Sequence, residues 1–273
     1  MTASPRRSHK FIEQKTRLLI KNTYTPFRAY VFKRLGQTNG MKKFLTILCG
    51  ILLAAAQICG PIFKPLILQA ESDKTIYFTF DDGPTDSTTP KILDVLKQYD
   101  VRATFFVIGK QIRGREEIVK RQYLEGHEIA IHTYSHDYNR IYASPGSLKN
   151  DIFLCKKAIL NVLPFWKSNL YRFPGGSANA PAALRNLIQE YGLHAVDWNA
   201  SVEDAVRPHA NANELFQSAV QSSEGKNTVV LLLHDGVNYR ATVECLPDLI
   251  SYYKNKGYKF KTLNPIQSEA NSE

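Results

Sequence analysis

The chain has 273 residues, 44% of them hydrophobic and 22% charged, with a formal net charge of +10. Residues 1–70 hold 12 Lys and Arg against one acidic residue, whereas residues 71–273 hold 23 against 24. A nucleic-acid-binding domain carries its positive charge on the folded part, so this distribution excludes nucleic acid as a partner and leaves one sizeable domain after residue 70.

Residues 1–40 form a basic lead that precedes an apolar segment. Two interpretations stay open for this lead. It is a cytoplasmic tail on a signal anchor, or it is a start-site artefact and Met41 is the true first residue.

Residues 41–70 are predicted to be a signal peptide or an uncleaved signal anchor. Lys42 and Lys43 stand before an apolar run, and Phe44 to Cys59 contains no charged residue. Positive charge before such a run holds that end in the cytoplasm and sends the following chain outward. Leu68 to Ala70 is a candidate cleavage site. We therefore expect an extracellular or cell-envelope protein that touches the membrane only through this segment.

Strand-like and helix-like runs alternate from Ile76 onward. We expect strands at Ile76–Phe80, Ala103–Ile108, Glu128–Ile131, Leu170–Tyr171, His194–Trp198, Val229–Leu233 and Tyr258–Leu263. We expect helices at Pro90–Gln98, Glu116–Glu125, Leu148–Leu163, Ala182–Tyr191, Asn213–Ser222 and Thr242–Lys254. About seven such units favour a (β/α) barrel over an open parallel sheet. Residues 71–266 are thus predicted to be one catalytic domain, followed by a polar tail at 267–273.

Two cysteines, Cys155 and Cys245, lie in this domain. Two cysteines do not make a disulfide framework, so buried free thiols are the favoured interpretation, with a single bridge left open.

Polar residues follow most of the predicted strands. In a barrel of this kind the chemistry lies at the carboxyl ends of the strands, so these residues are expected to meet at one rim. They are Asp81 and Asp82, His132, Arg172, the stretch from Asp197 to Asp204, and His234 with Asp235.

Two of these runs predict a metal-assisted hydrolase. Asp81 and Asp82 stand where a hydrophobic strand meets a Gly-Pro turn, and successive strand residues point to opposite faces, so they are not expected to share a role. His132 and His136 are four residues apart and, on a helical turn, face one ion. One carboxylate and two imidazoles make a facial ligand set, and the spare carboxylate is then a base for water.

With these motifs in place, the chain resembles the polysaccharide deacetylases of carbohydrate esterase family four. The resemblance runs from Lys74 to Leu263 and rests on five short motifs in order. It implies a distorted (β/α) barrel that removes N- or O-acetyl groups from sugars. It also implies a divalent metal, usually Zn²⁺, with Co²⁺ or another divalent ion as alternatives.

The first three motifs imply roles for individual residues. Asp81 matches the general base, and Asp82, His132 and His136 match the metal ligands. Arg172, in the run Arg-Phe-Pro-Gly-Gly, matches the arginine that holds the base carboxylate and favours its ionised form.

The remaining matches imply the groups around the acetyl carbonyl and the leaving group. The backbone N–H near Gly175 matches the oxyanion donor, although many relatives carry an aromatic residue there and this glycine leaves the groove wall open. Leu232 matches the wall of the acetyl pocket, and His234 matches the general acid. Asp204 matches the acidic partner of that histidine, with Asp197 as a competitor.

The sequence thus predicts an exported, monomeric N-deacetylase of an acetylated polysaccharide, with peptidoglycan as the expected target. One alternative is a deacetylase of another N-acetylated glycan or chitooligosaccharide, or an O-acetyl xylan esterase. A non-catalytic wall-binding protein on a retired enzyme fold is the other. The presence of the complete set of base, metal ligands and acid argues against this non-catalytic alternative.

Overall fold

The computed structural model of the protein describes residues 74–263. The chain divides into two compact units, Met1–Leu68 and Gln69–Glu273, and the described residues all belong to the second. The predicted basic lead, signal segment and polar tail lie outside the described residues. Within residues 74–263, none of the helices is both long enough and apolar enough to cross a membrane.

One parallel sheet organises the domain. Its strands are β1 (Thr75–Asp81), β2 (Thr104–Ile108), β3 (Glu128–Thr133), β4 (Leu170–Tyr171), β5 (His194–Ala195), β6 (Ala200–Ser201), β7 (Thr228–His234) and β8 (Lys259–Phe260). Their order is β5-β4-β3-β2-β1-β7-β6, and β8 pairs with the start of β1. The two end strands, β5 and β6, are both described and are not paired with each other. The sheet is therefore an open half-barrel, which confirms the predicted α/β fold.

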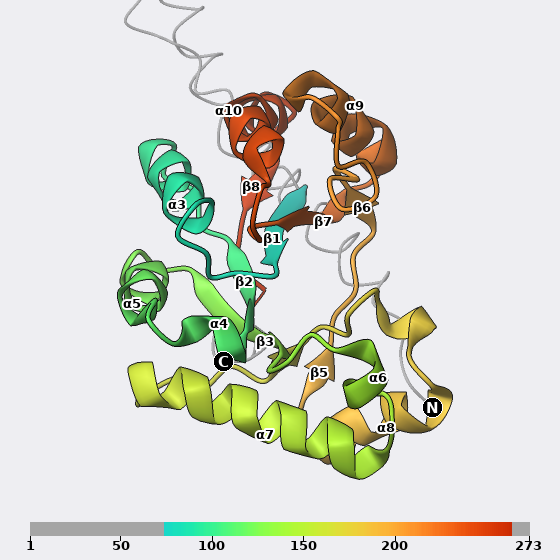
Figure 1. Ribbon diagram of the computed structural model, residues 1–273. Helices are drawn as coiled ribbons and strands as arrows, with labels where there is room; N and C mark the ends of the chain where they lie inside the picture. The colour runs from blue at the N-terminus through green and yellow to red at the C-terminus, as the bar shows by residue number, and fades with distance from the viewer. Residues whose placement is uncertain (1–73, 264–273) are drawn as a thin grey trace, which may run out of the picture. The chain divides into compact units, whose positions relative to one another are not determined.

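Helices cover the outside of this half-barrel (Figure 1). They are α3 (Thr89–Gln98), α4 (Gly109–Ile112), α5 (Glu116–Leu124), α6 (Tyr138–Ile141), α7 (Pro145–Val162), α8 (Ala182–Glu190), α9 (Ala212–Ser223) and α10 (Arg240–Asn255), with a 3₁₀ turn, η1, at Ser177–Asn179. In Figure 1, α9 and α10 lie together near β6 and β7, whereas α7 and α8 lie near β3 and β5 at the other end of the sheet.

Local sequence explains where the helices begin. The Ser144 side chain caps α7 by accepting a hydrogen bond from the Ser147 N–H, and Pro145 occupies the first turn, where its missing N–H costs nothing. Asn211 and Glu214 form a reciprocal capping box at the start of α9. Cys155 on α7 and Cys245 on α10 are both buried free thiols, so the favoured interpretation holds.

The chain between β5 and β6 departs from the prediction. The pattern predicts one strand over residues 194–198, but β5 ends at Ala195 and β6 begins at Ala200. The backbone changes partner here, since the Val196 N–H donates to the Tyr171 carbonyl while the Asn199 N–H donates to the Val230 carbonyl. This segment crosses the open side of the half-barrel, and a single continuous strand cannot pair with both ends.

The pleat of the strands sorts side chains between two cores. The outward residues of β1, Ile76, Phe78 and Phe80, belong to the large core beneath the helices. Phe106, Ala130 and Leu170 form a small separate core. Each of these three is adjacent in sequence to residues of the large core, so by strand alternation they face the inside of the half-barrel. The same alternation directs the polar residues at the strand ends inward.

Candidate active site

Four strands each contribute a polar side chain to the inside of the half-barrel at its carboxyl end. Asp81 is the last residue of β1, His132 lies in β3, Arg172 follows β4 and His234 is the last residue of β7. All four residues are buried. Each follows an outward-facing core residue, so the strand pleat itself brings them together.

Asp82, His132 and His136 form a cluster that fits a metal ion. One ligand atom from each lies within 4.8 Å of the others. Asp82 Oδ1 is 3.2 Å from His136 Nε2 and 3.5 Å from His132 Nε2, and this buried oxygen has no hydrogen-bond partner. Burial acts to raise the pKa of Asp82, but the two imidazoles outweigh it and hold that pKa well below its usual range. One carboxylate and two imidazole nitrogens are ligands that Zn²⁺ takes with positions left open.

The two histidines do not lie on a helical turn, which corrects the predicted geometry. β3 runs to Thr133, two residues further than expected, so His132 is a strand residue. The chain then turns, and His136 adopts a left-handed backbone with φ of 51°. Asp82 is also left-handed, with φ of 79°, so it leaves the strand and points away from the direction of Asp81.

A buried carboxylate from α7 fixes this turn. Asp151 accepts hydrogen bonds from the Tyr134 N–H at 2.6 Å, the Ser135 N–H at 3.1 Å and the Ser135 hydroxyl at 2.6 Å. The ring of His132 is oriented by donation from Nδ1 to the Arg172 carbonyl at 2.9 Å, which leaves Nε2 facing Asp82. Sequence reasoning missed Asp151. The sequence feature that could have revealed Asp151 is an acidic residue next to Ile152, on the apolar side of a predicted helix.

Asp81 is held by a buried arginine. Arg172 Nη1 donates to Asp81 Oδ1 at 2.9 Å and to the Thr79 hydroxyl at 2.8 Å, and Nε donates to the Val196 carbonyl at 3.0 Å. The guanidinium carbon lies 4.1 Å from the centroid of the Phe106 ring. Burial lowers the pKa of Arg172, and the charge of Asp81 partly opposes this effect. A guanidinium stays charged even so, and it remains a fixed donor to Asp81.

A further carboxylate, Asp235, supports the turn after β1 and was not predicted to have a role. Its N–H donates to the Asp81 carbonyl at 2.9 Å, and its Oδ2 accepts from the Thr89 hydroxyl at 2.7 Å. A Cβ placed on Gly83 would lie 2.0 Å from that Oδ2, so only glycine fits there. Burial, together with the charges of Asp82 and Asp81, raises the pKa of Asp235 to about 7.

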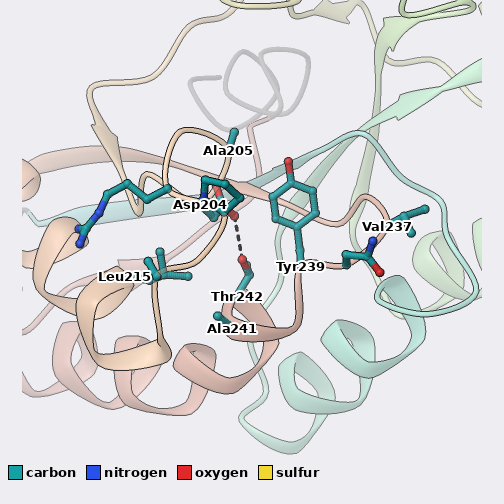
Figure 2. A pocket seen from close by; sticks show the side chains of 11 residues that line it. Asp204, Ala205, Leu215, Val237, Tyr239, Ala241 and Thr242 are labelled. Carbon is teal, nitrogen blue, oxygen red and sulfur yellow. Dashed lines mark hydrogen bonds between the residues drawn. The ribbon is translucent and has the colours of Figure 1, made fainter.

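His234 is paired with Asp204. Its Nδ1 lies 2.7 Å from Asp204 Oδ1, and Oδ2 accepts from the His234 N–H at 2.9 Å. Asp204 Oδ2 also accepts from the Thr242 hydroxyl at 2.8 Å, the bond drawn in Figure 2. Burial acts to lower the pKa of His234, but the hydrogen bond and charge of Asp204 outweigh it and raise that pKa to about 9. Asp197 lies elsewhere, and its carboxylate accepts from the N–H and hydroxyl of Ser177.

Tyr239 covers one side of the His234 ring. The two rings are stacked, with centroids 5.2 Å apart and planes 17° from parallel. A cavity of about 190 Å³ lies beside Tyr239 and Asp204, with Leu215 and Val237 in its lining (Figure 2). No sequence signal marked Tyr239, because the stacking depends on a loop in which Asn238 takes a left-handed backbone with φ of 72°.

Gly175 and Leu232 are the two predicted residues of the oxyanion and acetyl pocket. Leu232 is buried in β7, beside the acid at its end. Gly175 has φ of 71°, and an added Cβ would lie 3.1 Å from the Tyr138 hydroxyl. The ring of Tyr138 also stands edge-on to His136, with centroids 5.7 Å apart. Tyr138 therefore lies beside Gly175, where the lack of a side chain was expected to leave the groove wall open.

The geometry of these groups defines a class of chemistry. A buried carboxylate held by arginine, a His–Asp pair and a ligand set for a divalent metal could supply a base, an acid and a Lewis-acid position. This is the set that a hydrolase of acyl groups needs.

Known proteins share this fold and sequence pattern. The family profile described as polysaccharide deacetylase matches residues 69–196. A peptidoglycan-N-acetylglucosamine deacetylase of Bacillus cereus is 35% identical over 201 residues, which cover 71% of this chain and 89% of that protein. The solved structure of a Streptococcus mutans CE4 esterase has a TM-score of 0.66 at 32% identity, covering 70% of this chain and 87% of the other.

The chain belongs to the polysaccharide deacetylase family, which confirms the predicted family and hydrolase class. It is also 30% identical over 205 residues to the peptidoglycan-N-acetylglucosamine deacetylase PgdA of Listeria monocytogenes. The match covers 75% of this chain but only 41% of that relative, so the Listeria protein is much longer than the shared domain.

Proposed function

We propose that the protein is an exported, metal-dependent N-deacetylase that removes acetyl groups from N-acetyl sugars of peptidoglycan. The observation that carries the amide specificity is the His234–Asp204 pair, which raises the pKa of His234 to about 9. An amide nitrogen is a very poor leaving group unless it is protonated, and a histidine that stays protonated through neutral pH supplies that proton. An ester needs this acid far less.

A divalent metal fits the Asp82, His132 and His136 cluster, because it would satisfy the unpartnered Asp82 Oδ1 and both Nε2 atoms. We infer Zn²⁺ from the mixed carboxylate and imidazole donor set, with Co²⁺ or another divalent ion as alternatives. When bound, such an ion polarises an acetyl carbonyl and makes a neighbouring water more acidic.

The chain's own residues then perform the proton transfers. Asp81, held by Arg172, takes the proton of the attacking water as the oxygen bonds to the acetyl carbon. The backbone N–H of Gly175 donates to the oxygen that gains negative charge, and Leu232 walls the pocket of the acetyl methyl. His234 then gives its proton to the sugar nitrogen, the C–N bond breaks, and acetate and the free amine leave.

The substrate and the location of the protein rest on its relatives and on the predicted export signal. The Bacillus and Listeria relatives bear the name peptidoglycan-N-acetylglucosamine deacetylase. Residues 41–70 as signal peptide or anchor would place the catalytic unit at the cell envelope, beside such a substrate. The alternative of an O-acetyl esterase is favoured by the likeness to the Streptococcus protein, which is named an esterase.

Acetate release by the purified protein tests this proposal. The substrates are peptidoglycan, N-acetylchitooligosaccharides and acetylated xylan, each with and without a chelator and with Zn²⁺ or Co²⁺ added back. Release from peptidoglycan that stops with chelator and returns with metal supports the proposal, and product masses then identify the sugar. Release from xylan alone would favour the esterase, and no release from any substrate with metal restored would overturn the enzyme assignment.

A further inference from the structure

Acidic residues are scarce in one stretch of the catalytic unit, which gives that stretch a net positive charge. Residues 138–189 contain seven Lys and Arg and a single acidic residue, Asp151, although residues 71–273 as a whole are nearly balanced at 23 against 24. Asp151 is buried and holds the turn between the metal-site histidines, so it adds no negative charge to the surface. The exposed part of this stretch is therefore basic.

The outer face of α7 combines this charge with exposed apolar side chains. Lys149, Phe153, Lys156 and Leu160 are spaced by four, three and four residues, which places them on one face of the helix. Phe153 is 60% exposed and Leu160 is 40% exposed, and Phe165, just past the helix end, is 83% exposed. Large apolar side chains gathered on a surface mark an interaction site.

The face of α7 next to this one, about 100° around the helix, is already occupied. Leu148, Ile152, Cys155 and Ile159 pack into the large core, so the helix cannot rotate to bury its outer face. In Figure 1, α7 lies at the end of the sheet away from α9 and α10. The outer face therefore needs a partner from outside the unit.

The chemistry of this face selects among partners. The lysines of α7 form no ion pair among residues 74–263, and Lys149 lies over the Tyr191 ring, 5.8 Å from its centroid. A second copy of the chain would bring lysines against lysines, and a soluble polyanion would leave the phenylalanines in water. An anionic bilayer satisfies both kinds of group, because apolar side chains enter the headgroup boundary while lysines face lipid phosphates.

We propose that the outer face of α7 docks on an anionic phospholipid bilayer, with Phe153, Leu160 and Phe165 inserted and Lys149, Lys156, Lys157 and Lys167 on lipid phosphates. This contact is separate from the segment 41–70 and does not depend on the proposed reaction. Since Asp151, on the same helix, fixes the His132–His136 turn, docking would also set the orientation of the metal cluster to the membrane.

The test uses residues 69–273, because the apolar run at 44–59 would bind bilayers by itself. This unit is compact by itself, and the Streptococcus structure, matched over 87% of its own chain, corresponds to 70% of this protein. Flotation with phosphatidylcholine vesicles is compared with flotation on vesicles that also contain phosphatidylglycerol. Docking predicts binding to the anionic vesicles that is at least about tenfold tighter and weakens as salt is raised.

Three variants separate the possible partners. Lys156→Glu with Lys157→Glu is expected to weaken binding at least about 25-fold, about fivefold for each lysine lost. Phe153→Ser with Phe165→Ser is expected to weaken it about tenfold or more, whereas Leu124→Ser, at a leucine 81% exposed on α5, should leave it unchanged. Circular dichroism checks the fold of each variant, so the result stands whether or not acetate is released.

Three results would overturn the proposal. Equal binding to neutral and anionic vesicles would remove the role of the lysines. If the lysine variant loses vesicle binding and the phenylalanine variant keeps it, the face binds polyanions through charge alone. Self-association without lipid that the phenylalanine variant abolishes would show an interface between copies of this chain.

Discussion

Asp204→Asn isolates what one carboxylate does to His234. The carboxylate accepts from the imidazole Nδ1 at 2.7 Å, and the pKa of His234 is raised from 6.5 to about 9. An amide keeps the shape but removes the charge, so only the smaller effects of Asp81 and Asp82 then oppose burial, and that pKa falls toward its ordinary value. At pH 8 the protonated fraction of the imidazole then drops from about nine tenths to about 3%, or roughly 30-fold.

The sign of the pH dependence follows from the role of His234 as an acid. The protonated form is the active one, so activity is present below the pKa and is lost as the pH rises through it. The wild-type protein should lose activity near pH 9, and Asp204→Asn should lose it below pH 7. At pH 6 the protonated fraction changes less than about twofold, so the two proteins should differ far less there.

The assay is initial acetate release between pH 5 and 10 on whichever N-acetyl substrate is turned over. NMR titration of the His234 ring gives the same pKa without relying on turnover. Asp197→Asn is the matched control, because its carboxylate contacts Ser177 and not His234. The reasoning would be refuted if the loss of activity at alkaline pH stayed at the wild-type pH in Asp204→Asn, or if it moved in Asp197→Asn. Asp204 is buried with three donors, so the variant should also lose about 1–3 kcal/mol of stability.

Three further substitutions test the turn after β1. Asp81→Asn should lower turnover by at least about 10³-fold and leave the metal bound, whereas Asp82→Asn should lose the metal. Metal content after dialysis measures the difference. Loss of metal from Asp81→Asn but not from Asp82→Asn would show that their roles are exchanged. Gly83→Ala should lower the free energy of unfolding by about 3 kcal/mol, because its Cβ would lie 2.0 Å from Asp235 Oδ2. Gly146→Ala, with its nearest neighbour 3.8 Å away, should leave denaturant unfolding nearly unchanged, and equal losses in both would contradict the packing argument.

Much of the site could be predicted because strands order their side chains locally. Asp81, Arg172 and His234 each end or directly follow a predicted strand, and the carboxyl ends of parallel strands meet at one rim, so their common position was predicted from the pattern. The divided strand between Ala195 and Ala200 could not be predicted in this way. Its partners are strands far away in sequence, and only the open sheet shows that the backbone must change from one to the other.

The sequence by itself determined the fold class, the rim and the kinds of group gathered there, since periodicity and residue chemistry are properties of short segments. Only the tertiary structure decided which acid serves His234, because Asp197 and Asp204 are both far from it in sequence and the path of the chain brings only Asp204 to 2.7 Å. The tertiary structure likewise decided that Asp151 supports the histidine turn and that the Tyr239 ring stacks on His234. Contacts between distant segments depend on how helices and loops pack on the sheet, and no local pattern determines that packing.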